Sequence, residues 1–336
     1  MSTMDYKSIV LSALDTMRLG ELAASERFKA AAYKKAIDTL KRMDGPLTKI
    51  EDIAGLEGIG KKIHEKIVEI LATGALQSAN RMAARTDVGA MEELLAVHGI
   101  GPAKARILIA AGIQSIADLR TRSAADKKLL TSAQKLGLKY YEDGKQRIPR
   151  AEMVKHEAIL LAAIADKAAV PSSLQGSIVG SYRRGAANSG DIDMLLTYKT
   201  SEADASAFLS KAIESFTNSG YVIDTLVSGA KKWMGYVRLN ASSTARRLDI
   251  MITPPEEYAY AILYFTGSDK FNIAFRKHCL SLGYSLNEHT LSRTDPSKPA
   301  PGPMSTEEDI FKFVSLKYIP PTERVDQKQI IPLIKK

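Results

Sequence analysis

The sequence has a single cysteine, Cys279, among its 336 residues. One thiol can form neither an internal disulfide nor a multi-cysteine zinc site, so we expect a protein of a reducing compartment without a zinc finger. No uncharged apolar run approaches the roughly 20 residues that cross a bilayer, and the N-terminal residues lack the basic start and apolar stretch of a secretory signal. The sequence therefore predicts neither a membrane protein nor a secreted one.

The chain has fewer acidic than basic residues. The chain has 47 lysines and arginines against 38 aspartates and glutamates, which gives a formal charge of +9 and favours a polyanionic partner. Residues 100–155 alone hold 12 basic and 5 acidic side chains. Such a segment is either a solvated helical face or a surface laid along phosphates, and the flanking motifs must decide between the two.

Apolar periodicity divides the chain into a helical part and a mixed part. Residues 1–84 have Ala-rich, charge-interleaved stretches at helical spacing, and residues 85–146 continue in the same style. From about residue 170 the runs SLQGSIVGSYRRG, DIDMLLTY, WMGYVRL and RLDIMIT are β-branched and partly alternating, which predicts strands. We therefore predict an α+β multidomain chain that is first helical and then, over residues 147–255 and 256–336, a mixture of helices and strands.

The helical part contains a short internal repeat. LEGIG at residues 56–60 recurs as VHGIG at residues 97–101, and each copy opens a helix-like segment. Glycines allow a tight turn and a close approach to phosphate, and the following helix presents free N–H groups to an anion. Two copies in a basic region predict two helix–hairpin–helix grips on the DNA backbone, formed around Gly58, Gly60, Gly99 and Gly101. The hairpin carbonyls can also hold Na⁺ or K⁺, with backbone ligands from Ala54, Leu56, Ile59, Leu95, Val97 and Ile100.

Three aspartates form a candidate metal site. Asp191 and Asp193 flank apolar Ile192 at the start of a strand-like run, so alternation places both carboxylates on one face. Asp249 lies in another predicted strand that can pair alongside. Crowded carboxylates repel one another unless cations neutralise them, and oxygen ligands suit Mg²⁺, with Mn²⁺ as a substitute. Two such ions, about 4 Å apart, would activate an attacking hydroxyl and stabilise leaving pyrophosphate. An Asp-x-Asp pair alone is more often surface charge or a turn.

The segment before the aspartates favours the metal interpretation. GSYRRG at residues 180–185 combines a Gly-Ser turn, a helix-like stretch and a forked guanidinium, the parts needed to seat a triphosphate. No Gly-Lys-Ser/Thr follows a Gly-rich loop, so this is not a P-loop. The arrangement of Gly-Ser, then Asp-x-Asp, then a distant Asp resembles the nucleotidyltransferase superfamily.

With the two hairpins, GSYRRG, SGDID and YFTGS at residues 264–268 all in order, the chain resembles the X family of DNA polymerases. The likeness runs end to end and includes LATG, GLKYYED, RIPRAEM, LNEHT and EEDIFKFVSLKY. It implies a helical lyase domain over residues 1–84, a DNA-binding subdomain over 85–146, a catalytic palm over 147–255 and a nucleotide-selecting subdomain over 256–336.

The resemblance also implies roles for individual residues. Asp191, Asp193 and Asp249 would hold two Mg²⁺ ions, with Asp249 nearest the primer 3′-hydroxyl. The triphosphate would be bound by Arg147, Ser181, Arg184, Ser189 and Gly190. Tyr264, Phe265 and Gly267 would pack against the deoxyribose and leave little space for a 2′-hydroxyl. Asp269 and Asn272 would lie beside the incoming base, and Arg276 would contact the template strand. Taken singly, Tyr264 and Phe265 can also be core aromatics, and Ser189 can be a turn residue.

Lysines in the N-terminal helices form a second candidate site. Lys62 and Lys66 are one helical turn apart, and an earlier helix carries Lys29, Lys34 and Lys35. Such lysines are either a solvated face with phosphate contacts or, because neighbouring ammonium groups lower one another's pKa, a source of a neutral nucleophilic amine. The resemblance implies that Lys66 forms a Schiff base with an abasic sugar and releases 5′-deoxyribose phosphate by β-elimination. Lys29, Tyr33 and Lys62 match supporting phosphate-binding positions, Lys35 is a further DNA-binding candidate, and Glu65 is a candidate proton acceptor.

The sequence departs from the family at several positions. Phe28 stands where relatives have His, and Ser78 and Ala54 replace basic residues, so we expect a weaker phosphate pocket. Met251 replaces an Arg that pairs with the middle metal-binding Asp, and His289 replaces a nearby Tyr.

We expect a DNA-directed DNA polymerase that fills short gaps in base excision repair and has 5′-deoxyribose-phosphate lyase activity. Its partners would be gapped or nicked double-stranded DNA, dNTPs and other repair enzymes, and the chain itself would be a monomer. Two alternatives stay open: template-independent nucleotide addition, which the short segment 239–245 disfavours, and a non-catalytic DNA-binding scaffold, which the three aspartates disfavour. We expect a nucleus or another DNA-containing compartment, such as a mitochondrion or a virus-infected cell.

Overall fold

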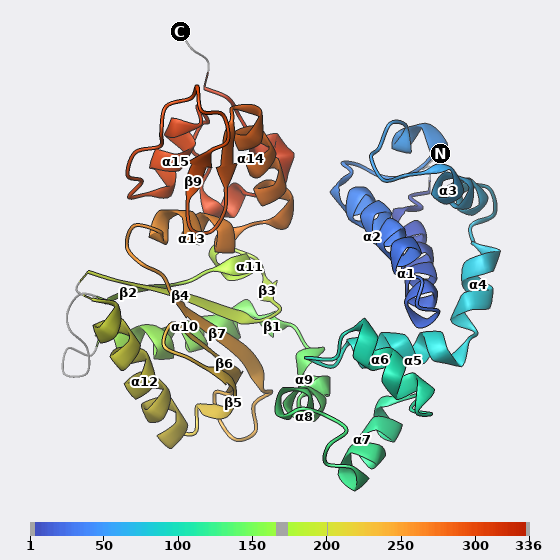
Figure 1. Ribbon diagram of the computed structural model, residues 1–336, viewed down its shortest axis with the longest axis horizontal. Coiled ribbons are helices and arrows are strands. Elements are labelled where there is room, and N and C mark those ends of the chain that lie inside the picture. The colour runs from blue at the N-terminus through green and yellow to red at the C-terminus, as the bar shows by residue number, and fades with distance from the viewer. Residues whose placement is uncertain (1–3, 166–173, 200, 334–336) are drawn as a thin grey trace. The chain divides into compact units, whose positions relative to one another are not determined.

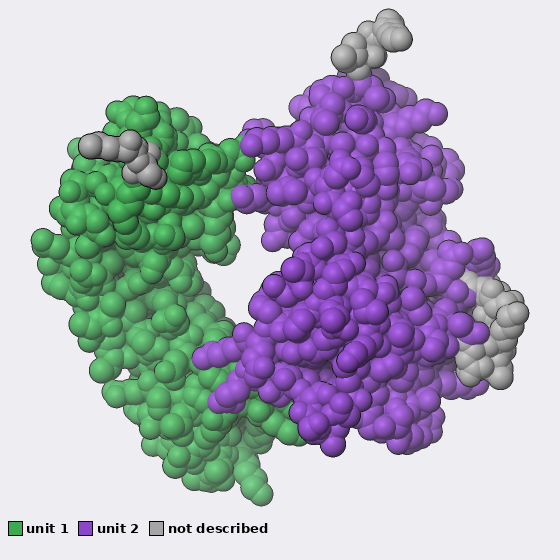
Figure 2. All heavy atoms as spheres, turned by 180° about the vertical axis from the view of Figure 1, so that it is seen from behind, with its two compact units in different colours: residues 1–141 green, residues 142–336 purple. Residues whose placement is uncertain are grey.

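The structure is a computed structural model of the chain that describes residues 4–165, 174–199 and 201–333. The chain divides into two compact units, residues 1–141 and 142–336, which Figure 2 colours separately. Unit 1 is helical and unit 2 mixes helices and strands, as the sequence predicted. Over the described ranges, none of the helices combines the length and apolar character that a membrane crossing requires. The boundaries between the four predicted domains stay a prediction.

Unit 1 consists of helices, as Figure 1 shows. Their apolar side chains form two clusters. The first cluster includes Leu14, Leu40 and Ile67, and the second includes Met91 and Leu108, all fully buried. Apolar residues at helical spacing face these clusters, while lysines and glutamates stay in water. The helices of unit 1 are α1 (Lys7–Ala23), α2 (Arg27–Arg42), η1 (Ile50–Ile53), α3 (Lys61–Thr73), α4 (Gln77–Ala83), α5 (Thr86–Leu95), α6 (Pro102–Ala110), α7 (Ile116–Ala125) and α8 (Ser132–Lys139), and α9 (Tyr141–Gly144) spans the boundary between the units.

Unit 2 begins with a five-stranded sheet in the order β2-β4-β7-β6-β5 (Figure 1). Strands β4 and β7 are parallel, and the other neighbours are antiparallel. The strands are β2 (Leu174–Ile178), β4 (Ile192–Tyr198), β5 (Val222–Ser228), β6 (Lys232–Val237) and β7 (Arg246–Ile252), and β1 (Ile148–Pro149) pairs with β3 (Asn188–Ser189) outside this sheet.

Side chains that alternate along the strands give the sheet two different faces. On one face Met194 and Leu196 pack against α10 (Arg150–Ala165) and α12 (Glu202–Asn218). On the other face Leu195 and Met251 pack against α13 (Tyr258–Thr266). Because side-chain direction alternates with a period of two, Asp193 shares the α13 face with Leu195. The sheet therefore directs its carboxylates toward the C-terminal part of unit 2.

The C-terminal part of unit 2 surrounds an aromatic cluster. Phe271, Phe275 and Phe311 are almost fully buried there, and the Phe275 and Phe311 rings meet edge to face at 4.8 Å. Its elements after α13 are α14 (Asp269–Ser281), β8 (Tyr284–Leu286), β9 (Leu291–Arg293), α15 (Glu307–Phe313), η2 (Pro321–Glu323) and η3 (Gln327–Gln329).

Two local predictions need correction. The first expected strand ends at Ile178, and the GSYR that follows forms the short helix α11 (Gly180–Arg183), because Gly180 at φ +63° turns the chain out of the sheet. The first residue of that expected run, Ser173, lies outside the described residues. Strand β5 was not predicted, because polar Asp224 and Thr225 stand side by side within its apolar residues; its pairing with β6 has register shifts. The expected strands at β4, β6 and β7 and the helix α12 are confirmed.

Candidate active site

The three predicted aspartates come together at one end of the sheet. Asp193 on β4 lies directly opposite Asp249 on β7 in the parallel register, and Asp191 immediately precedes β4. Burial raises the pKa of Asp193 to about 7, and the negative charges of Asp191 and Asp249 add to the rise. The three carboxylates are therefore close enough to repel one another, as the sequence predicted.

An arginine that sequence reasoning missed neutralises part of this charge. Arg247 donates from Nη2 to Asp191 Oδ2, and its Nε lies 3.4 Å from Asp249 Oδ1. The signal was present, because Arg247 stands two residues before Asp249 on the same strand and therefore on the same face. Met251 in turn packs with apolar residues. The site thus has an arginine although Met251 replaces the expected one, and its hydrogen bond goes to the first aspartate rather than the middle one.

The donor set fits divalent cations. Over the described residues, no three His, Cys, Asp or Glu side chains are arranged as a ready metal-binding group, and Arg247 donates a hydrogen bond to Asp191. Three carboxylates beside one arginine nevertheless leave a negative site of hard oxygen donors, which suits Mg²⁺ or Mn²⁺. Burial is the main reason for the raised pKa of Asp193, and the negative charges of Asp191 and Asp249 add to it. Asp191, Asp193 and Asp249 are the side chains that would hold such ions.

Helix α11 lies directly beside the carboxylates. Asp193 O accepts a hydrogen bond from Val179 N at 2.9 Å, and a Cβ at Gly180 would lie 3.2 Å from Asp193 Oδ2. A side chain at residue 180 would therefore crowd the carboxylate. Ser181 Oγ donates to Ser189 Oγ at 3.0 Å, so two predicted triphosphate ligands are neighbours.

Two arginines support the other side of α11. Arg147 donates from Nε to Asn188 Oδ1 at 2.8 Å, and its Nη1 would lie 3.0 Å from a Cβ at Gly190. Arg150, which the sequence did not single out, donates to Tyr182 O at 3.0 Å and covers the Tyr182 ring. The structure thus brings Arg147, Ser181, Ser189 and Gly190 to one edge of the site.

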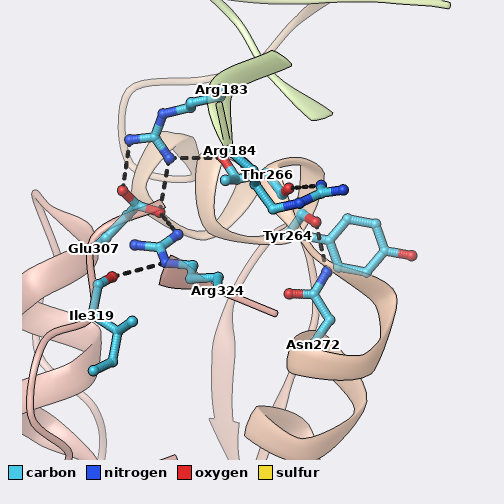
Figure 3. A network of polar contacts seen from close by, with 8 residues as sticks. All are labelled: Arg183, Arg184, Tyr264, Thr266, Asn272, Glu307, Ile319 and Arg324. Carbon is cyan, nitrogen blue, oxygen red and sulfur yellow. Dashed lines mark hydrogen bonds and ion pairs between the residues drawn. The ribbon is translucent and has the colours of Figure 1, made fainter. Parts of the chain in front are cut away.

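Arg184 links this edge to the segment predicted to face the sugar. Its Nη1 donates to Thr266 O at 2.5 Å, and a Cβ at Gly267 would lie 3.1 Å from the same nitrogen (Figure 3). Burial lowers the pKa of Arg184, and the nearby Asp269 carboxylate opposes that shift. Gly267, the residue after Thr266, has φ +69°, a conformation that glycine adopts without strain.

The residues predicted to face the sugar and the base pack closely. The Tyr264 and Phe265 rings meet edge to face at 5.2 Å, and Asn272 Nδ2 donates to Tyr264 O at 2.7 Å. Tyr264, Asn272 and Arg276 line a cavity of only about 10 Å³, which has no room for a nucleobase. The structure therefore gathers these side chains without opening a base-sized space between them.

The two predicted hairpins have the same local geometry. Gly58 and Gly99 have φ of +89° and +82°, and Gly60 and Gly101 are the extended N-caps of α3 and α6. Neither helix has a side-chain cap, so the first N–H groups are left for another acceptor. In the candidate cation sites, Leu56 O accepts from Ile59 N and Val97 O from Ile100 N, while Ala54 ends η1 and Leu95 ends α5.

The predicted amine site is a cavity of about 600 Å³ in unit 1. Lys66 and Glu65 line it from α3, together with Lys29, Tyr33 and Lys62 and two further carboxylates, Glu21 and Glu69. Burial and the Glu21 charge raise the pKa of Tyr33. The lining therefore carries three carboxylates beside its three lysines, and the nucleophilic amine expected at Lys66 stays a prediction.

Some predicted DNA contacts lie away from this cavity. Lys35 pairs with Glu57 of the first hairpin at 2.6 Å instead of lining the cavity. Phe28 is 94% exposed and does not line it either. The structure thus separates the amine site from a hairpin-facing lysine and an exposed aromatic side chain.

Comparisons with known proteins agree with this arrangement. Successive parts of the chain match four sequence families: a helix-hairpin-helix domain over residues 7–76, the fingers domain of DNA polymerase lambda over 92–145, the DNA polymerase beta palm over 147–255 and the DNA polymerase beta thumb over 261–325.

Two curated relatives match nearly the whole chain. DNA polymerase lambda from Rattus norvegicus is 31% identical over 334 residues, which cover 95% of this chain and 56% of the relative. DNA polymerase lambda from Arabidopsis thaliana is 29% identical over 349 residues, which cover 96% of this chain and 64% of the relative. The chain thus spans less than two thirds of the length of either relative. The helix-hairpin-helix, fingers, palm and thumb matches follow one another along the chain, and the three converging aspartates lie in the palm match, so the chain belongs to the X family of DNA polymerases.

Proposed function

We propose that the chain is a DNA-directed DNA polymerase that fills short gaps in double-stranded DNA during base excision repair. The observation that carries the proposal is the register of Asp193 against Asp249, with Asp191 alongside and α11 against the same carboxylates. When bound, two divalent ions supply activation of the primer 3′-hydroxyl and stabilisation of the leaving pyrophosphate.

The chain's own residues orient the reactants. Asp249 holds the position nearest the primer hydroxyl, which attacks the α-phosphate of the dNTP while pyrophosphate leaves. Arg147, Ser181 and Arg184 bind the triphosphate with forked or hydroxyl donors. The hairpins and the basic segment 100–155 hold DNA through its phosphates, without dependence on sequence.

A lyase activity in unit 1 is the second part of the proposal. The cavity that Lys66 lines admits a sugar phosphate, and Lys29, Lys62 and Tyr33 supply donors for the phosphate. Lys66 would attack the sugar aldehyde and form a Schiff base with loss of water. Loss of a C2′ proton to Glu65 or a neighbouring carboxylate would then break the C3′–O bond, with the DNA phosphate as leaving group. Hydrolysis of the Schiff base would release the unsaturated sugar 5′-phosphate and regenerate Lys66.

The alternatives have less support. Template-independent addition needs a segment long enough to take the place of the template, whereas β6 and β7 are joined by residues 238–245 alone. A non-catalytic scaffold would not need three converging carboxylates. A nuclear or other DNA-containing compartment stays a prediction.

The two proposed chemistries can be tested by residue. Asp249→Ala should lower single-nucleotide gap filling roughly a thousandfold or more, because the primer hydroxyl loses its nearest metal ligand. The same protein should still be trapped on abasic DNA by borohydride, which reduces a Schiff base. Lys66→Ala should do the opposite. Lys34→Ala is the matched control, since Lys34 lies on α2, pairs with Asp38 and does not line the cavity.

Each result counts against one activity only. Parental gap filling by a folded Asp249→Ala protein would refute the polymerase site. Parental trapping by Lys66→Ala would refute the assignment of the lyase to Lys66, whatever the polymerase does.

A further inference from the structure

The two consecutive arginines of GSYRRG bind the same residue. Arg183 Nη1 donates to Thr266 Oγ1 at 2.7 Å, and Arg184 Nη1 donates to Thr266 O at 2.5 Å (Figure 3). Thr266 is the last residue of α13 and has no exposed surface. One buried residue is therefore held at its side chain by one arginine and at its backbone by the other.

Arg183 is itself fixed by a buried ion-pair network. It donates to both carboxylate oxygens of Glu307, at 3.2 and 2.8 Å. Arg324 donates to Glu307 Oε1 at 2.5 Å and to Ile319 O at 2.9 Å, and its side chain has no exposure. Burial alone would raise the pKa of Glu307, but the hydrogen bonds from Arg183 and Arg324 keep it below its ordinary value. Glu307 is therefore ionised and holds the Arg183 fork in one orientation.

Thr266 connects this network to the segment proposed to face the nucleotide sugar. Tyr264 and Phe265 precede it, and Gly267 follows it at the end of α13. Asn272 Nδ2 donates a hydrogen bond to Tyr264 O at 2.7 Å, at the other end of this segment. Arg183 and Arg184 both donate hydrogen bonds to Thr266. These bonds therefore set the distance between α11, which carries triphosphate ligands, and residues 264–267. A binding site excludes an extra hydroxyl only where closely packed atoms fill the space that the hydroxyl would need.

We propose that Thr266 is a positioning residue that determines sugar specificity. Its hydroxyl, held by Arg183 against Glu307, keeps residues 264–267 close enough to the incoming nucleotide to exclude a ribose 2′-hydroxyl. The inference rests on the proposed polymerase function, and it assigns to the first arginine of the pair a role apart from the triphosphate.

Two substitutions at one position test the proposal. Thr266→Val keeps the side-chain shape and removes the hydroxyl, whereas Thr266→Ser keeps the hydroxyl and is the matched control. The measurement is kcat/KM for a dNTP and for the matching rNTP on DNA with a one-nucleotide gap and Mg²⁺. The ratio of the two values should fall about tenfold in Thr266→Val, as expected for losing a hydrogen bond to a charged group, and stay at the parental value in Thr266→Ser.

A second variant tests the proposal in case Thr266→Val does not fold. Arg183→Lys keeps the charge opposite Glu307 but lacks the fork that reaches Thr266 and Glu307 together, so it should lower the same ratio. Thermal unfolding shows which variants are folded. If the folded variants among Thr266→Val and Arg183→Lys keep the parental ratio, the proposal is wrong while the polymerase function stands. If the parent itself incorporates no dNTP, the proposed function and this inference are refuted together.

Discussion

Mild acid should destabilise unit 2 through one buried histidine. His156 on α10 has no exposed surface, and its Nδ1 lies 2.8 Å from Tyr221 Oη, while its Nε2 lies 3.7 Å from Glu152. Burial lowers the pKa of His156 from 6.5 to about 4, and the positive charge of Arg246 acts in the same direction, whereas Glu152 opposes the shift. The native ring is therefore neutral at a pH at which the ring of the unfolded chain takes up a proton.

The sign and size of the effect follow from the lowered pKa. Since the native pKa lies below the unfolded one, the contribution to stability is complete above pH 6.5 and is lost as pH falls toward about 4. At about 1.4 kcal/mol for each pKa unit, the drop corresponds to about 3 kcal/mol in the free energy of unfolding. His156→Asn gives the reference, because it keeps a polar group for Tyr221 and does not titrate in this range.

Urea unfolding can follow this unit alone, because the single tryptophan, Trp233, is buried in its core. Between roughly pH 7 and pH 5, the stability of the parent should fall more steeply than that of His156→Asn. Carboxylates that titrate in both proteins cancel in the difference. Parallel curves for the two proteins would show that His156 is not held neutral by burial.

Three further predictions concern binding and incorporation. Met251→Arg should slow nucleotide incorporation or raise the Mg²⁺ requirement, because it puts a charge into the apolar contact with α13; unchanged kinetics in a Mg²⁺ titration would contradict this. Affinity for gapped DNA should fall steeply with salt and depend little on flanking sequence, which fluorescence anisotropy can measure, and a flat response would count against phosphate-dominated binding. Gly137→Ala should weaken DNA binding and destabilise unit 1 by about 1–3 kcal/mol. The reason is that its Cβ would lie within 3.0 Å of His98 backbone atoms in the second hairpin. Gly89→Ala, whose Cβ meets nothing within 4 Å, should be neutral or stabilising.

Local patterns predicted the parts of the fold that depend on near neighbours in the sequence. The hairpins were predictable because a positive-φ glycine and a helix start lie within a few residues of each other, as Gly58 and Gly60 show. The aspartate cluster was predictable because strand alternation places Asp191 and Asp193 on one face. The parallel pairing of β4 with β7 sets Asp249 opposite Asp193.

Other features depend on contacts between distant residues. Arg183 meets Glu307 across 124 residues and Thr266 across 83, and no periodicity in the sequence predicts such pairs. The amine cavity shows the same limit, because Glu21 lines it from another helix than Lys66, and the spacing of the lysines does not predict that carboxylate. Arg247 is different: its spacing from Asp249 was sufficient to place it on the carboxylate face.

The two arginines of GSYRRG have different partners. Arg183 is the last residue of α11, and Arg184 follows it as the C-cap. In this chain Arg183 is committed to Glu307 and Thr266, and it is Arg184 that lies beside Gly267 and Asp269. The second guanidinium is therefore the one we propose for the triphosphate, and the first ties α11 to the segment proposed to face the sugar. A buried carboxylate such as Glu307 is needed because an arginine withdrawn from both water and the anion requires another counter-charge.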